Sequence, residues 1–184
     1  MFLAVDVDDE TRVQLGRARD AMQSVLDTAP VPPRITWVRA DAAHVTVRFI
    51  GNIPDESIPS LQGALSSVTV RPFEVKWGVA GTFGGTRNPR VIWIAPTDGA
   101  GAFQALAHVV NRALDPIVGP GDARDFSPHL TLGRVREACR RVNWTQALGA
   151  IRWVPTVTQV AHIVLYQSHL SPKGPTYTAL SSHG

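Results

Sequence analysis

Two short segments with the same pattern constrain this chain more than any other feature. Residues 44–47 read HVTV and residues 129–132 read HLTL, so the two copies start 85 positions apart. Each copy alternates polar with β-branched or apolar residues, which predicts a strand. Because residues i and i+2 of a strand point to the same face, each copy places an imidazole beside a hydroxyl. One His-x-Thr triplet is common by chance, but two copies predict two half-sites facing each other across a polar cleft.

The residue types of this pair indicate acid–base chemistry at phosphorus. An imidazole titrates near pH 6.5, so one histidine can remove a proton while the other donates one. The hydroxyls of Thr46 and Thr131 can donate to phosphoryl oxygens. This set needs no metal if the leaving oxygen is protonated. The residues alone do not say which histidine is the acid.

Longer stretches around both triplets carry a resemblance to a known family. Residues 44–51 (HVTVRFIG) and 127–134 (SPHLTLGR) resemble the signature motifs of the two-histidine (2H) phosphoesterases. Within them the chain resembles most the RNA 2′,3′-cyclic phosphodiesterases, historically also called 2′-5′ RNA ligases. Further matching stretches lie along essentially the whole chain, at residues 1–5, 37, 90–94, 165–168 and 174–177. One departure is the Ala42-Ala43 pair, where relatives commonly have Asn-Leu or similar, which puts a neighbouring loop contact in question.

The resemblance implies a fold, a reaction and a set of roles. The implied fold is α+β and bilobal, with two pseudo-symmetric lobes whose antiparallel sheets line a central groove, and with the helices outside. The implied reaction is hydrolysis of a 2′,3′-cyclic phosphate RNA end to a 2′-phosphate. In the family's pattern His44 is the proton donor, His129 is the proton acceptor, and Thr46 and Thr131 hold the phosphoryl oxygens.

Two arginines are candidate phosphate contacts. Simple alternation places Arg48 on the face of His44 and Thr46. Arg134 matches an arginine that closes the second motif in relatives, but alternation places it opposite Thr131, so its role requires the strand to end or bend there. A solvated surface charge is the alternative for both. Three aromatic residues could stack a nucleobase or belong to the core: Trp37, Phe126 and Tyr177.

Periodicity and turn residues predict strands interleaved with helices. Strands are expected over 1–7, 35–38, 44–50, 73–80, 90–94, 156–166 and 176–180, helices over 9–28, 57–68 and 101–115, and a helical turn over 144–149. Loops are expected over 119–125 and 169–175. The glycine-rich segment 82–90 lacks a P-loop signature and is expected to connect a hairpin. No linker composition separates the halves, so residues 1–184 are expected to form one domain.

Composition places the chain among ordinary globular proteins. It is 44% hydrophobic, has a net charge of +3, and contains only two lysines, so its positive charge is nearly all arginine, which suits an anionic substrate. Cys139 is its single cysteine, which excludes an internal disulfide and is typical of a reducing cytoplasm. We expect neither a signal peptide nor a membrane span, because the apolar start meets three aspartates by residue 9.

The expected ligands and partners follow from these observations. We expect no metal and no cofactor, since His162, His169 and His183 lack the spacing of a metal site. The expected substrate is RNA with a 2′,3′-cyclic phosphate end or a small cyclic nucleotide, bound by a monomer with no obligate protein partner. Alternatives that use the same site are 2′-5′ RNA ligation and a cyclic nucleotide-sugar phosphodiesterase. A non-catalytic RNA- or nucleotide-binding module is a further alternative, but binding alone would not need two titrating imidazoles.

Overall fold

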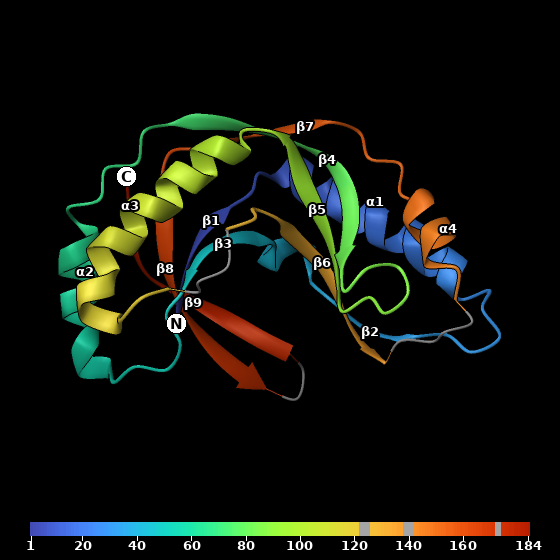
Figure 1. Ribbon diagram of the computed structural model, residues 1–184, viewed down its shortest axis with the longest axis horizontal. Helices are drawn as coiled ribbons and strands as arrows, with labels where there is room; N and C mark the ends of the chain where they lie inside the picture. The colour runs from blue at the N-terminus through green and yellow to red at the C-terminus, as the bar shows by residue number, and fades with distance from the viewer. Residues whose placement is uncertain (122–125, 138–141, 172–173) are drawn as a thin grey trace.

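Two antiparallel sheets lie side by side in the computed structural model, which describes residues 1–121, 126–137, 142–171 and 174–184 (Figure 1). The first sheet has the order β3-β1-β8-β9, from β3 (His44–Phe49), β1 (Phe2–Asp6), β8 (Ile163–Ser171) and β9 (Gly174–His183). The second has the order β2-β6-β5-β4-β7, from β2 (Arg34–Trp37), β6 (Leu130–Glu137), β5 (Val91–Asp98), β4 (Phe73–Phe83) and β7 (Thr156–Val160). The helices are α1 (Asp9–Leu26), α2 (Ile58–Leu65), α3 (Ala100–Val118) and α4 (Trp144–Gly149), with 3₁₀ turns η1 (Ala40–Ala42) and η2 (Asp55–Ser57). The predicted fold class, with two antiparallel sheets, is confirmed.

Each of the two longest helices packs against the sheet that does not contain the strand before it. Helix α1 follows β1 of the first sheet but packs on β7 and α4, whereas α3 follows β5 of the second sheet and packs on β3 and α2 (Figure 1). Each presents the apolar face that the sequence predicts, since Leu15 and Met22 of α1 and Phe103 and Leu114 of α3 are buried. Each sheet is thus packed by a helix that follows a strand of the other sheet, and the motif strands β3 and β6 contact each other where the two sheets meet.

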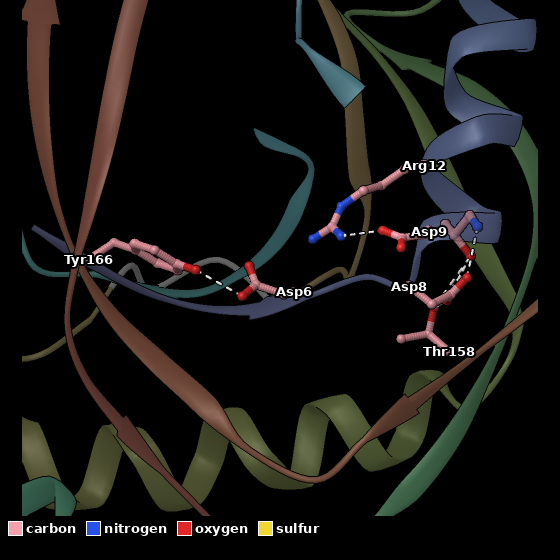
Figure 2. A network of polar contacts seen from close by, with 7 residues as sticks. Asp6, Asp8, Asp9, Arg12, Thr158 and Tyr166 are labelled. Atoms are coloured by element: carbon pink, nitrogen blue, oxygen red, sulfur yellow. Dashed lines mark hydrogen bonds and ion pairs between the residues drawn. The ribbon is translucent and has the colours of Figure 1, made fainter. Parts of the chain in front are cut away.

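A buried polar cluster fixes the start of α1 on the second sheet. Asp8 caps the helix by accepting from the Thr11 backbone N–H at 2.8 Å, and it also accepts from the Thr158 hydroxyl of β7 (Figure 2). The Trp77 indole N–H donates to the Thr158 hydroxyl at 2.9 Å. Burial opposes ionisation of Asp8, but the hydrogen bonds from Thr158 and Thr11 prevail and lower the pKa of this carboxyl. Because Asp8 lies two residues after the end of β1, this cluster joins the two sheets.

Some predicted boundaries are confirmed and others are wrong. The hairpin predicted around residues 82–90 is present, since β4 and β5 pair up to Phe83 and Val91. The single strand predicted over 156–166 is instead β7 and β8, which belong to different sheets because the chain crosses between them at residues 161–162. The loop predicted over 169–175 is wrong in its described part, where the ladder of β8 and β9 continues to the pair Ser171 and Gly174. The predictions for residues 122–125 and Cys139 lie outside the described residues.

Candidate active site

The two motif strands meet at the middle of the molecule. Strand β3 forms the outer edge of the first sheet and contacts β6 of the second, which lies between β2 and β5 (Figure 1). A groove of about 480 Å³ runs along this junction, and His44, Thr46, Thr131 and Arg134 are among its lining residues. His129 immediately precedes β6, two residues before Thr131, and is not among the residues that line this groove. The fold therefore places His44, Thr46 and Thr131 along one groove, with His129 at the end of the strand that carries Thr131.

The same contact orients both imidazoles. The Nδ1 of His44 lies 2.9 Å from the carbonyl oxygen of Ala42, and the Nδ1 of His129 lies 2.8 Å from that of Ser127. A carbonyl oxygen only accepts, so Nδ1 carries the proton and donates in both rings. Each Nε2 can then accept a proton when the ring is neutral and donate one when it is cationic. The fold thus holds two acid–base groups in the same tautomer.

The two imidazoles have different charged surroundings. Burial is the main cause that lowers the pKa of both His44 and His129, and the charge of Arg134 lowers both further. The charge of His129 also lowers the pKa of His44, so the two rings lie within electrostatic reach of each other. Asp6 acts only on His44 and raises its pKa. The two histidines therefore share their orientation but differ in their charged surroundings.

Asp6 is fixed beside His44 by the sheet and by a tyrosine. It is the cross-strand partner of His44 in the ladder of β1 and β3, and its carboxylate accepts from the hydroxyl of Tyr166 at 2.8 Å (Figure 2). A second cavity of about 300 Å³ is lined by Asp6, His44 and Tyr166 together with Tyr177. Burial and the Asp6 carboxylate raise the pKa of Tyr166, so this phenol stays protonated and keeps donating.

A one-residue bulge follows each motif threonine. In the first ladder Ala4 pairs with Thr46 and Leu3 pairs with Arg48, which leaves Val47 as the extra residue. In the second ladder Trp93 pairs with Thr131 and Ile92 with Gly133, which leaves Leu132 as the extra residue. Because the extra residue breaks the alternation of faces, every side chain beyond it points the opposite way from the simple prediction.

The first bulge removes Arg48 from the groove, so its predicted place beside His44 and Thr46 is wrong. The Arg48 side chain is 5% exposed and faces α3. Its guanidinium donates to Asn111 at 2.6 Å, to Asp115 at 2.8 Å and to the carbonyl oxygen of Gly119 at 2.6 Å. Arg48 therefore ties β3 to the end of α3.

The second bulge turns Arg134 toward the groove. Arg134 is exposed and lines the cavity with Thr131, so the bend that its predicted role required is present. The equivalent residue of the first motif is Phe49, which also stands five positions after its histidine. Phe49 is 71% exposed and lines the same cavity. Phe49 is not among the site residues predicted from the sequence, although aligning the two motifs places it at the position of Arg134.

The three aromatic candidates separate into two groups. Trp37 and Tyr177 line the groove, and the Tyr177 ring meets the His44 ring edge-on at 5.2 Å. Trp37 is held by its indole N–H, which donates to Gln23 at 2.6 Å. Phe126 instead packs against Phe103 in the hydrophobic core. Trp37 and Tyr177 thus offer surfaces to a ligand in the groove.

Two searches of the described residues bear on other classes of site. Within residues 1–121, 126–137, 142–171 and 174–184, no group of three or more His, Cys, Asp or Glu side chains is placed to hold a metal ion. In the same part of the chain, no helix is both long enough and apolar enough to cross a membrane.

Comparison with known proteins gives consistent matches over nearly the full length of the chain. The profile of the 2′-5′ RNA ligase superfamily matches residues 7–171. A protein of Archaeoglobus fulgidus named RNA 2′,3′-cyclic phosphodiesterase is 30% identical, and the match covers 98% of this chain and 97% of that protein. A Thermus thermophilus protein of the same name is 31% identical, with 98% and 87% covered.

Solved structures match the fold. The crystal structure of TT0787 from Thermus thermophilus has a TM-score of 0.75 at 25% identity, covering 98% of this chain and 94% of that one. Escherichia coli LigT complexed with 3′-AMP has a TM-score of 0.72 at 24% identity, again covering 98% and 94%. At this identity the likeness to LigT establishes the shared fold.

Proposed function

The chain belongs to the 2′-5′ RNA ligase superfamily, and we propose that it is a metal-independent RNA 2′,3′-cyclic phosphodiesterase that leaves a 2′-phosphate. The observation that carries this proposal is the identical anchoring of two imidazoles, His44 and His129, through Nδ1. His44 lines one groove with Thr46, Thr131 and Arg134, and the charge of His129 acts on His44. The relatives that are named RNA 2′,3′-cyclic phosphodiesterase at 30 and 31% identity support the substrate class.

The proposed reaction is one in-line displacement. A water molecule attacks phosphorus, and the neutral Nε2 of His129 takes its proton as the P–O bond to water forms. The P–O3′ bond breaks on the opposite side, where Nε2–H of protonated His44 gives its proton to the departing oxygen. The hydroxyls of Thr46 and Thr131 donate to the non-bridging oxygens, whose negative charge Arg134 balances. The net change is the addition of one water molecule.

The carboxylate beside His44 supports this assignment of acid and base. Val5 pairs with Val45 just as Ile94 pairs with Leu130, so Ala95 is the equivalent in β5 of Asp6 in β1. Ala95 has no ionisable group, whereas Asp6 raises the pKa of His44. His44 therefore keeps its proton to a higher pH than it would without the carboxylate, as an acid requires, while His129 lacks this aid and suits the base.

The two walls of the groove would bind different parts of the substrate. Arg134 stands on the β6 wall and Phe49 on the β3 wall. An exposed aromatic ring suits the sugar or base, and a cation suits the phosphate. A ribose fixed between unlike walls presents only one of its two oxygens to His44, so a single product isomer is expected.

The test is a short RNA ending in a 2′,3′-cyclic phosphate, incubated with the protein in excess EDTA. We expect a product heavier by one water molecule, with a phosphatase-sensitive 2′-phosphate whatever the terminal base. His44→Ala, prepared in the same way, is the control for contaminating nucleases. A 3′-phosphate or a mixture of isomers would contradict the assigned pose. Loss of activity in EDTA that added Mg²⁺ or Mn²⁺ restores would contradict the metal-independent mechanism.

Ligation is the same displacement with an RNA 5′-hydroxyl in place of water: O5′ attacks phosphorus, the P–O3′ bond breaks, and a 2′-5′ phosphodiester remains. The family's name favours testing it. A 2′-phosphodiester formed from a cyclic end and a 5′-hydroxyl RNA in the same assay would reveal it. A cyclic nucleotide-sugar phosphodiesterase would instead prefer a small substrate. The site offers two acid–base groups, which a binding module does not need.

A further inference from the structure

A second arginine continues the basic wall of the groove beyond Arg134. Arg136 stands two residues further along β6, so both side chains point to the same face of the strand. Both are exposed, and both line the groove that contains His44 and Thr46. The groove thus extends along β6 past the position at which a single phosphate would contact Arg134.

A neighbouring strand positions Arg136. Its Nε donates to the Thr36 hydroxyl of β2 at 3.1 Å, and Thr36 is also the cross-strand partner of Arg134. This bond fixes one edge of the guanidinium and leaves the two terminal nitrogens for another acceptor. Among the ion pairs of the described residues, neither Arg134 nor Arg136 takes part. An arginine that is held through Nε and forms no ion pair with a described residue is suited to bind a phosphate, because its planar guanidinium can donate two hydrogen bonds to it.

The spacing of the two arginines matches a polymer. Two residues of a strand advance about 6.7 Å, which is of the order of the distance between successive phosphates of an extended nucleotide chain. The neighbouring wall of the groove consists of Thr36, Trp37 and Val38 of the β2 segment, which can contact a sugar or a base.

Resting on the proposed function, we propose that Arg136, held by Thr36, is a second phosphate site. It would bind the phosphodiester on the 5′ side of the terminal nucleoside while Arg134 contacts the cyclic phosphate. The preferred substrate is then an oligonucleotide, and a cyclic mononucleotide uses only part of the groove.

The experiment compares two substrates that differ only in this phosphodiester: adenosine 2′,3′-cyclic phosphate and the dinucleotide ApA that ends in the same cyclic phosphate. For the unmodified protein we expect kcat/KM to be at least about 10-fold higher on the dinucleotide, since a hydrogen bond to a charged group is gained. Arg136→Gln should remove most of this advantage and leave kcat/KM on the mononucleotide unchanged. Thr36→Val should remove a smaller part of it.

A salt titration separates a phosphate contact from a general loss of charge. Arg136→Gln should reduce the slope of log kcat/KM against log salt by about 0.7 on the dinucleotide, the value for one phosphate of a single strand, and not on the mononucleotide. Arg112→Gln, which removes another exposed charge, on α3 and outside the lining of both cavities, is the matched control and should change neither.

The outcomes distinguish this inference from the proposed function. Equal kcat/KM of the unmodified protein on both substrates would overturn the second site and leave the phosphodiesterase intact. The same loss on both substrates in Arg136→Gln would also overturn it, because Arg136 would then act at the terminal phosphate. If the unmodified protein hydrolyses neither substrate, the proposed function fails and the second site fails with it.

Discussion

Replacing Arg48 and Arg134 one at a time tests whether the bulges, and not simple alternation, decide which side chains face the substrate. Alternation would put Arg48 on the face of Thr46 and Arg134 away from the face of Thr131. The structure has the reverse, with Arg48 buried against α3 and Arg134 lining the groove. The two variants should therefore have opposite phenotypes.

For Arg48→Met we expect a loss of stability. The guanidinium has three acceptors, Asn111, Asp115 and the carbonyl of Gly119, and a hydrogen bond to a charged group contributes about 1.5–3 kcal/mol. The sum is an upper limit, because the Asp115 side chain is 42% exposed and regains water when the arginine is removed. Methionine also keeps much of the buried volume. We expect the free energy of unfolding to fall by about 2–4 kcal/mol, or Tm by roughly 5–15 °C.

For Arg134→Gln we expect a loss of activity without a loss of stability. Arg134 is exposed and forms no ion pair with a described residue, so stability should change by less than about 0.5 kcal/mol. If its guanidinium donates to a phosphoryl oxygen, the lost bond of about 1.5–3 kcal/mol lowers kcat/KM roughly 10- to 150-fold. Arg134→Lys should recover part of this loss, because it restores the charge but not the fork.

The assay measures urea unfolding and kcat/KM on the same preparations, at a temperature where both variants are folded. Arg48→Met should keep kcat/KM within a few-fold of the unmodified protein. A variant at Arg48 that keeps its stability but loses activity as Arg134→Gln does would refute the reasoning. Reduced stability of Arg134→Gln with unchanged kcat/KM would equally contradict it.

Two further predictions concern the imidazoles. His44→Ala and His129→Ala should each reduce kcat about 10²- to 10⁴-fold, and the double variant should lose far less than the product, because the pair acts as one unit. The pH profile of kcat/KM should be bell-shaped. The rate constant should rise as His129 loses its proton and fall as His44 loses its proton. Both limbs should lie at lower pH than for free imidazoles, because burial lowers both pKa values. Asp6→Asn removes the charge that raises the pKa of His44, so the alkaline limb should move to lower pH and the acid limb should stay. Tyr166→Phe, which keeps the carboxylate, is its control, and movement of the acid limb instead would reverse the assigned roles.

The sequence predicted the family and the fold class, and it placed His44, Thr46 and Thr131 in what the structure shows to be one groove, because these predictions rest on local patterns. His44 and Thr46 share a face through the period of a strand, and the same holds for the second copy. The apolar faces of α1 and α3 are likewise local. The crossing between β7 and β8 was missed because both halves of residues 156–166 are apolar and β-branched, and only tertiary pairing separates them.

The two bulges could not be predicted, since a bulge depends on the partner strand as well as on the strand itself. Nothing in residues 44–51 alone shows that β1 offers one residue against two of β3. The register of the strands also shows where the two half-sites differ, which the two triplets alone do not show. Beside equivalent histidines and threonines, the first half carries Asp6 and Phe49 where the second carries Ala95 and Arg134.

We propose that those two differences make a nearly symmetric site directional. With identical halves, either histidine could be the acid and a cyclic phosphate could bind in two opposite orientations of equal energy. The carboxylate of Asp6 favours the proton on His44, and Arg134 opposite Phe49 gives the phosphate and the nucleoside different walls. Both differences act in the same sense, because each fixes one end of the same displacement. In the proposed mechanism, a doubled scaffold would therefore need only a few substitutions, placed beside the two histidines and not at them, to release a single product isomer.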